Sequence, residues 1–380
     1  MSLRLKLSAL AAAVVLVACG GGDGGIEVNS TVSFGDSLSD VGTYRVGTIA
    51  AVGGGEFTVN PAATWTETVA AAVHTPAPCA AQTGLLTNIP GLTGAAVTNH
   101  TACTNYAQGS SRVSGIYGPN SATLQAAPFN QVNLGLMAVP LTTQMSTHLS
   151  KVGGAYSGKE LVTVLAGGND LFMNFGGIAA AGGGGAGAVG AAIAAGWSTD
   201  VQNAVAAGGA AATNAAVNAA AASMGAAGAE LAGLVKAQVL AKGARYVVVV
   251  NLPDVAQTPF GASLDAQSRG LVNTLVTTFN GQLQTGLNSS GALYIDAYTQ
   301  GRDQYANPSK YGITNNTTPA CSTTSPANPL QGSSIACTAA STIAPDTAGY
   351  AFADSVHPTP LGHQLLANYV IAQMRVVGWL

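Results

Sequence analysis

The stretch Thr31-Val32-Ser33-Phe34-Gly35-Asp36-Ser37-Leu38-Ser39-Asp40 places a serine directly after a short run of strand-forming residues. The residues from Thr31 to Phe34 favour an extended chain, and Gly35 breaks it. A turn or helix is expected to begin at Asp36. Ser37 should therefore lie on an elbow at the carboxyl end of a strand, where open α/β sheets carry their sites.

Strands and helices alternate along the rest of the chain. Strand-like runs occupy residues 161–166, 245–251 and 293–296, and the pattern of residues 264–287 and 362–377 is helical. This alternation predicts an α/β domain with three layers, in which helices cover both faces of a mostly parallel sheet.

An Ala- and Gly-rich segment at residues 176–229 interrupts this pattern. Its strong helix formers carry almost no large side chains, so we expect a helical insertion that packs through small residues. The insertion would belong to a single domain spanning residues 30–380. It is either a lid over the site or, as we favour, a surface addition.

The N-terminus has the pattern of an export signal. Two basic residues precede an apolar stretch at residues 7–17 that is too short to span a bilayer as a helix. The segment Leu16-Val17-Ala18-Cys19 resembles a bacterial lipobox, which implies a signal peptide at residues 1–18 and a lipid on Cys19. Residues 19–29 would form a Gly-rich tether. The alternative is an ordinary signal peptide with an incidental cysteine. The expected location is the bacterial outer membrane or cell surface, with the periplasm or secretion as alternatives.

Four cysteines remain besides Cys19, and an even number in an exported chain indicates disulfides. Three pairings are possible. We expect Cys79–Cys103 and Cys321–Cys337, because each pair brackets loop-like sequence. A zinc site is the disfavoured alternative, since there is no Cys-x-x-Cys motif and no paired histidine.

The composition excludes some classes of protein. Charged residues make up 8% of the chain, the net charge is −3 and there is no basic stripe, so nucleic acid is not an expected partner. The hydrophobic fraction of 48% and the clear strand-like runs exclude a disordered chain.

A second run, Asp354-Ser355-Val356-His357-Pro358, contains the histidine and the carboxylate that a nucleophilic serine needs. A serine hydroxyl is a poor nucleophile until a histidine takes its proton, and a carboxylate must hold that histidine in the right tautomer. The three-residue spacing lets Asp354 reach the ring of His357. In isolation Ser37 would be read as a helix N-cap, and His363 is a rival base that should lie within the closing helix.

Four blocks in this order resemble the GDSL, or SGNH, hydrolase family of serine esterases and lipases. They are Gly-Asp-Ser-Leu at 35–38, Asn-Tyr-Ala-Gln-Gly at 105–109, Gly-Gly-Asn-Asp at 167–170 and Asp-x-x-His at 354–357. Within the family the chain looks most similar to the bacterial lipase, phospholipase and autotransporter-esterase branch. The resemblance implies a flavodoxin-like α/β/α fold and a carboxylic ester hydrolase that needs no metal or cofactor.

The resemblance also assigns roles to residues. It implies a triad of Ser37, His357 and Asp354, with oxyanion donors from the N–H groups of Ser37 and Gly109 and the side-chain amide of Asn169. The second block departs from the Gly-Gly-Ala that relatives often carry, because a single Gly109 is followed by two serines. This departure leaves the register of that block open by one residue.

Several questions stay open at this stage. The same site would serve a phospholipase or an acyltransferase, and a non-catalytic surface lipoprotein is a further alternative. The expected substrate is a small-molecule or lipid ester. Tyr44, Trp65 and Phe172 either line an acyl pocket or belong to the core. We expect Asp36, Asp40 and Asp170 to have structural roles, and a metal role for Asp36 or Asp40 is disfavoured.

Overall fold

The computed structural model describes residues 25–380, so the expected signal peptide, Cys19 and most of the Gly-rich tether lie outside the described residues. At its centre is a sheet with the strand order β1-β4-β5-β6, in which every pairing is parallel. The strands are β1 Ser30–Gly35, β4 Glu160–Leu165, β5 Tyr246–Val250 and β6 Leu293–Ile295. The expected parallel sheet is therefore confirmed.

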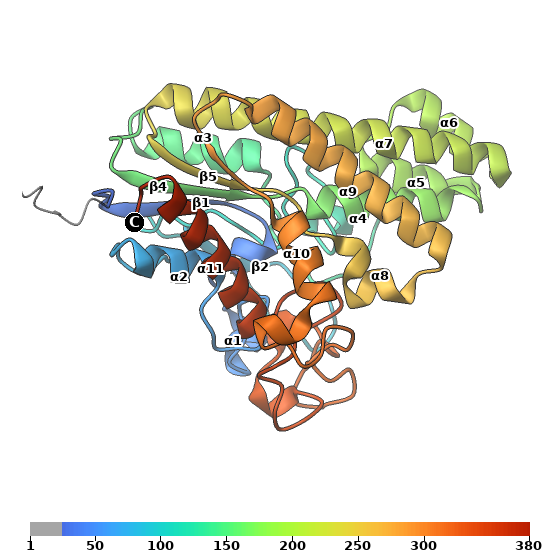
Figure 1. The fold of residues 1–380 in the computed structure, drawn as a ribbon. Helices are drawn as coiled ribbons and strands as arrows, with labels where there is room; N and C mark the ends of the chain where they lie inside the picture. Colours follow the sequence, from blue (N-terminus) through green and yellow to red (C-terminus); the bar gives the residue numbers. More distant parts are fainter. Residues whose placement is uncertain (1–24) are drawn as a thin grey trace, which may run out of the picture.

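Helices cover both faces of this sheet (Figure 1). On one face lie α2 Trp65–Ala72 and α11 Pro360–Val376, and on the other lie α3 Leu141–Lys151, α7 Gly209–Leu234 and α9 Ala266–Leu287. The remaining helices are α1 Gly47–Ala51, α4 Gly168–Ala181, α5 Gly185–Ala195, α6 Thr199–Ala206, α8 Pro259–Ser263 and α10 Ala297–Ala306. A small antiparallel pair joins β2 Gln82–Leu85 to β3 Ala95–Asn99.

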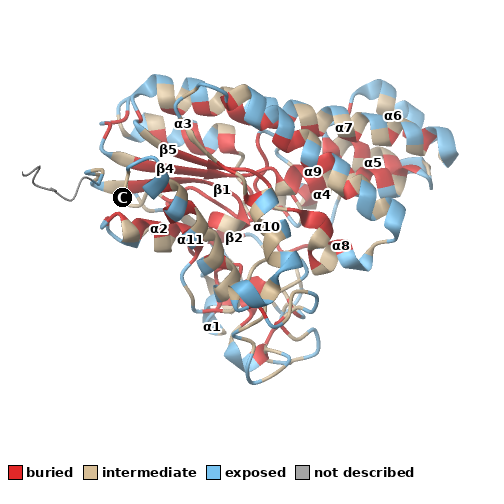
Figure 2. Ribbon diagram, viewed as in Figure 1, coloured by how far each residue is buried: buried red, intermediate tan, exposed pale blue. Residues whose placement is uncertain are grey.

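Alternation along the strands divides the core into two layers. In β4, Val162 and Val164 face the core under α3, α7 and α9, whereas Leu161 and Leu165 face α2 and α11. Side chains of a strand point to opposite faces in turn, so a strand buried on both faces is apolar throughout. Figure 2 accordingly shows the strands as buried along most of their length. The three-layer α/β/α fold is confirmed.

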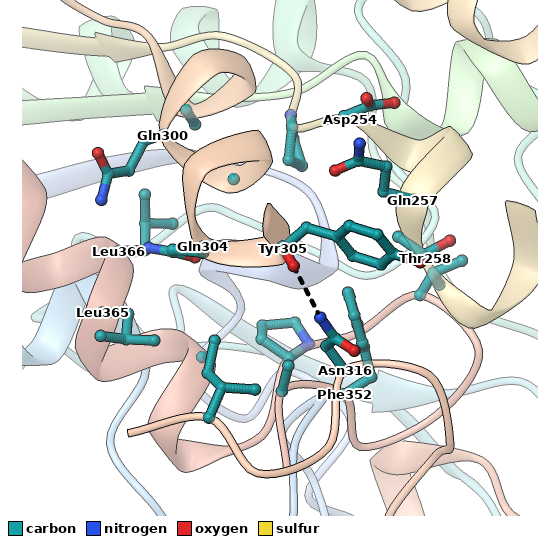
Figure 3. A pocket seen from close by; sticks show the side chains of 18 of the residues that line it. Asp254, Gln257, Thr258, Gln300, Gln304, Tyr305, Asn316, Phe352, Leu365 and Leu366 are labelled. Atoms are coloured by element: carbon teal, nitrogen blue, oxygen red, sulfur yellow. Dashed lines mark hydrogen bonds between the residues drawn. The ribbon is translucent and has the colours of Figure 1, made fainter. Parts of the chain in front are cut away.

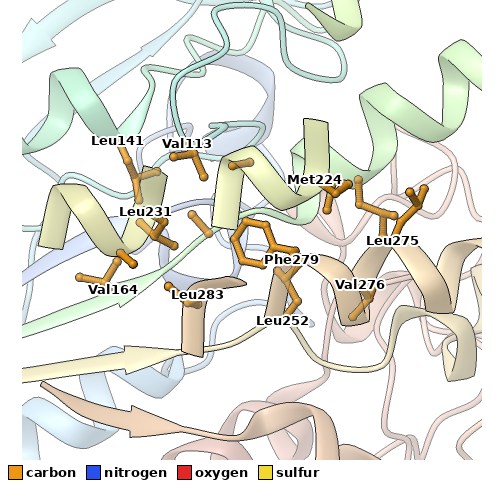
Figure 4. Packing of buried hydrophobic residues seen from close by; sticks show 14 of the residues in the cluster. Val113, Leu141, Val164, Met224, Leu231, Leu252, Leu275, Val276, Phe279 and Leu283 are labelled. Atoms are coloured by element: carbon orange, nitrogen blue, oxygen red, sulfur yellow. The ribbon is translucent and has the colours of Figure 1, made fainter. Parts of the chain in front are cut away.

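Residues 176–229 form the end of α4, all of α5 and α6, and most of α7. Small residues let α7 approach α9 closely, because a Cβ at Gly228 would overlap the carbonyl oxygen of Phe279. Figure 4 shows the Phe279 ring from α9 among Met224 and Leu231 of α7.

Two disulfides close loops of the molecule, with the expected pairing of Cys79 with Cys103 and of Cys321 with Cys337. The second lies in the long segment between α10 and α11. Across residues 25–380, no helix has the length and apolar character needed to cross a membrane.

Candidate active site

Ser37 lies two residues after Gly35, the last residue of β1, on a short 3₁₀ turn. The turn forms because the Asp36 side chain accepts a hydrogen bond from the N–H of Leu38 at 3.1 Å. The Gln144 side chain holds Gly35 in place. Its Oε1 accepts the N–H of Gly35 and its Nε2 donates to the carbonyl oxygen of Gly35, both at 2.9 Å. Both polar backbone groups of Gly35, two residues before Ser37, are thus hydrogen-bonded.

His357 connects Ser37 to Asp354. Its Nε2 lies 2.8 Å from Ser37 Oγ, and its Nδ1 lies 2.9 and 2.8 Å from the two carboxylate oxygens of Asp354. The structure thus brings together the three residues expected to form the triad, across 320 residues of sequence between Ser37 and His357.

Asp354 is surrounded by donors. Its carboxylate accepts the N–H groups of Ser334, Val356 and His357 at 3.0, 3.0 and 2.8 Å. Burial alone would raise the pKa of Asp354, but His357 and these donors hold that pKa well below its usual range. Burial lowers the pKa of His357 in turn, yet the Asp354 carboxylate outweighs it and raises that pKa above its ordinary value. Asp354 therefore stays charged and favours the imidazolium.

The Phe57 ring packs beside the imidazole of His357, with 4.9 Å between the ring centroids. Phe57 also touches the second block, because a Cβ at Gly109 would overlap its ring. Only a glycine fits between this ring and the rest of the block. Phe57 thus links His357 to the loop that was expected to hold the oxyanion.

The N–H of Gly109 donates to Asp40 Oδ2 at 3.0 Å, and Asp40 also accepts the N–H groups of Gly42 and Thr43. Burial raises the pKa of Asp40 to about 6 against these donors. An N–H that is committed to a buried carboxylate is poorly placed to serve a substrate. The oxyanion role expected of Gly109 therefore finds no support in this arrangement.

Ser110, the next residue, offers an alternative donor. Its φ of 70° lies in the left-handed region, which non-glycine residues seldom adopt. Within residues 25–380, neither its N–H nor that of Ser37 has a hydrogen-bond acceptor. The Asn169 side chain donates one of its N–H groups to the carbonyl oxygen of Ser111 at 2.9 Å, which leaves the second.

A buried ion pair fixes the second block to the third. Arg112 Nε donates to Asp170 Oδ1 at 2.9 Å, and the N–H of Val113 donates to the other oxygen at 3.0 Å. The guanidinium also donates to the carbonyl oxygens of Ala194 and Ala195 at the end of α5. Asp170 thus has the structural role that we expected, through a partner that the sequence analysis did not single out.

His363 does not compete for the role of base. It lies in α11, as expected, and its Nδ1 accepts the N–H of Trp65 at 3.4 Å. Burial lowers its pKa to about 4. Trp65 and Tyr44 are fully buried and belong to the core, while Phe172 packs edge-on against Phe260.

Residues 25–380 contain no group of three His, Cys, Asp or Glu side chains close enough together to hold a metal ion.

The chain resembles known proteins over most of its length. The family model of the GDSL-like lipases and acylhydrolases matches residues 32–370. A GDSL esterase/lipase of Arabidopsis thaliana is 31% identical over 140 residues, which cover 34% of this chain and 36% of that protein. Esterase EstA of Pseudomonas aeruginosa is 31% identical over 135 residues, covering 33% and 19%. The matched region thus spans about a third or less of these curated relatives.

Two solved structures have a TM-score of 0.40 to this chain. The extracellular lipase from Streptomyces rimosus has 15% sequence identity and covers 90% of this chain and 100% of its own. Phospholipase A1 from Streptomyces albidoflavus has 17% identity and covers 90% and 99%.

Proposed function

Because the chain belongs to the GDSL-like lipase/acylhydrolase family, we propose that it hydrolyses carboxylic esters through an acyl-enzyme on Ser37. The observation that carries the proposal is the continuous relay from Ser37 Oγ through the His357 ring to Asp354. Each link is 2.8 Å long, which is within the range of a functional nucleophile–base contact.

The first half-reaction transfers the acyl group to the protein. Ser37 Oγ attacks the ester carbonyl carbon while His357 Nε2 takes the hydroxyl proton. Asp354 keeps Nδ1 protonated and stabilises the imidazolium. The C–O bond to the alcohol then breaks, and His357 returns the proton to the leaving oxygen. In the second half, water attacks the acyl carbon by the same route and releases the acid and free Ser37.

Negative charge on the carbonyl oxygen needs donors that are already in place. We assign this role to the N–H of Ser37, the side-chain amide of Asn169 and, in place of Gly109, the N–H of Ser110. The Gly109 N–H is engaged by Asp40, whereas those of Ser37 and Ser110 have no acceptor within the described residues. Donors of this kind contribute roughly 2.7–4 kcal/mol each in other enzymes.

The proposal is tested with p-nitrophenyl esters and a Ser37→Ala variant. We expect the wild type to hydrolyse these esters and the variant to lose kcat by a factor on the order of 10⁶. A fluorophosphonate probe should label the wild type and leave Ser37→Ala unlabelled, as read by intact-protein mass. The matched control is Ser39→Ala, which lies in the same turn and whose hydroxyl accepts from Trp65. Equal activity of wild type and Ser37→Ala would refute the proposal.

We further propose that the protein is exported and held at a membrane by a lipid on Cys19. Support comes from the N-terminal pattern and from the two disulfides, which persist in oxidising compartments. Growth with an alkyne-tagged fatty acid should label the full chain but not a Cys19→Ala variant. Equal labelling of both would exclude this anchor.

A further inference from the structure

A cavity of about 140 Å³ lies next to the proposed catalytic residues, between α10, α11 and the loops at residues 253–258 and 351–358. Figure 3 shows side chains from these segments converging on it, with Leu365 and Leu366 from α11 opposite Gln257 and Thr258. Leu165, the last residue of β4, also lines the space. The cavity therefore lies at the carboxyl-end edge of the sheet, where β1 also delivers Ser37.

The cavity wall adjoins the catalytic residues in sequence. Leu38 follows Ser37 directly, and Val356 and Pro358 flank His357 on both sides; all three line the cavity. Ser37 and His357 are in contact with each other. This part of the wall is therefore made by residues that directly neighbour one or the other of them in sequence. Ser37 and His357 are not themselves among the lining residues, so an acyl chain on Ser37 would enter the cavity past Leu38, Val356 or Pro358.

The lining is suited to hydrocarbon. Most of the lining side chains are apolar: Leu38, Leu165, Pro253, Ala297, Ile313, Ala351, Phe352, Val356, Pro358, Leu365 and Leu366. Some of the polar groups around them have partners in the protein. Asp254 pairs with Arg302 at 2.8 Å, and Asn316 donates to the carbonyl oxygen of Tyr305 at 3.2 Å. The buried side-chain oxygen of Gln257 has no partner within the described residues.

The two halves of an ester make different demands on such a space. The alcohol must leave after the first half-reaction, whereas the acyl group stays on Ser37 until water attacks. An apolar hollow beside Ser37 suits the part that is retained. Its volume is close to that of a cavity of about 150 Å³ that holds benzene, which is the bulk of roughly six carbon atoms.

We propose that this cavity binds the acyl chain of the substrate and that the substrates are esters of medium-chain fatty acids. The proposal rests on the ester hydrolysis proposed above. Each methylene that enters the cavity should raise kcat/KM about fourfold, until the space is full. Longer chains gain nothing further, because their remaining methylenes stay outside.

Gly301 of α10 provides a variant that fills the cavity. It lines the space, and a Cβ at this position would meet no atom within 4 Å, so a leucine has room without moving backbone. Gly270→Leu is the matched control, because it also lies in a helix with no atom within 4 Å of a Cβ, but it is exposed and away from the cavity.

The measurement is kcat/KM of the full chain for p-nitrophenyl acetate, butyrate, octanoate and palmitate. We expect a maximum near octanoate in the wild type and in Gly270→Leu. In Gly301→Leu, the ratio of kcat/KM for octanoate to kcat/KM for acetate should fall about tenfold or more. A flat chain-length profile in the wild type, or one that Gly301→Leu leaves unchanged, would overturn the acyl-chain proposal.

Failure of the proposed function has a different signature, namely no ester hydrolysis at any chain length or hydrolysis that survives Ser37→Ala. Calorimetric titration of Ser37→Ala with sodium octanoate tests the cavity in either case. We expect Gly301→Leu in that background to weaken octanoate binding about tenfold or more, and Gly270→Leu to leave it unchanged. Equal octanoate affinity in all three proteins would contradict the assignment.

Discussion

The balance of charge between two residues sets the pH range in which the proposed reaction can run. His357 accepts the proton of Ser37 only when its ring is neutral, and Asp354 raises the pKa of His357 above its ordinary value of 6.5. We therefore predict that kcat/KM rises with pH along an acid limb whose midpoint lies above 6.5. Profiles of kcat/KM measured from pH 5 to 10 give this midpoint.

Asp354→Asn removes the carboxylate that favours the imidazolium. The limb should then move to lower pH, and kcat should fall by a factor on the order of 10⁴ because the tautomer is no longer fixed. A variant with the wild-type midpoint would show that Asp354 does not control the charge of His357.

Asp36 places a second carboxyl in the protein interior, and burial raises its pKa from 3.8 to about 7. Between these values the unfolded chain has lost the proton that the folded chain keeps, so stability falls as the pH rises through this window. Asp36→Asn removes this penalty, and its amide oxygen can still accept the N–H of Leu38. We predict a gain on the order of 2 kcal/mol at pH 8 and almost none at pH 4, read from Tm at the two pH values.

Asp40→Asn is the contrasting variant for this prediction. One carboxylate oxygen of Asp40 accepts the N–H groups of Gly42 and Thr43, and the other accepts that of Gly109. An amide would turn a donor toward at least one of them. Asp40→Asn should therefore lower Tm at both pH values, and a loss of stability in Asp36→Asn at pH 8 would contradict the burial argument.

Among the elements, the close contact between α7 and α9 depends on single glycines. A Cβ at Gly228 would overlap the carbonyl oxygen of Phe279, whereas a Cβ at Gly233, also in α7, would meet no atom within 4 Å. We predict that Gly228→Ala costs about 1–3 kcal/mol by overpacking. Gly233→Ala should gain roughly 0.5–1 kcal/mol from helix propensity. Thermal unfolding of both variants tests this, and equal Tm values would contradict the packing.

The sequence predicts those parts of the site whose residues interact locally. The elbow at Ser37 follows from an apolar strand and a glycine, and the reach of Asp354 to His357 follows from a three-residue spacing. The parts that it does not predict join distant segments. Gln144 forms hydrogen bonds with Gly35 across 109 residues of sequence, and no local pattern near either residue predicts this contact.

The same reason explains the outcome at the second block. The family resemblance points to Gly109, but the N–H of Gly109 donates to Asp40, which lies 69 residues earlier and for which the sequence predicts only a structural role. Likewise, the contact of Phe57 with His357 spans 300 residues and leaves no local pattern. Residue types at motif positions identify the chemistry, whereas hydrogen-bond partners follow only from the folded chain.

At the scale of the whole molecule, the two disulfides hold different parts of the site. Cys321 pairs through its N–H with the carbonyl oxygen of Ala353, and Cys337 lies three residues after Ser334, whose N–H donates to Asp354. The Cys321–Cys337 disulfide therefore steadies the Asp354 carboxylate. The other disulfide steadies the second block, since the carbonyl oxygen of Cys79 accepts the N–H of Asn105.

Removal of each disulfide by paired Cys→Ser substitution should separate these effects. Both variants should lose about 3 kcal/mol of stability, because each disulfide closes a loop of similar length. Only loss of Cys321–Cys337 should also move the acid limb of kcat/KM to lower pH, because a less ordered Asp354 raises the pKa of His357 less. Loss of Cys79–Cys103 should lower kcat and leave that limb in place. If both variants shift the limb equally, the disulfides act on the fold as a whole and not on separate parts of the site.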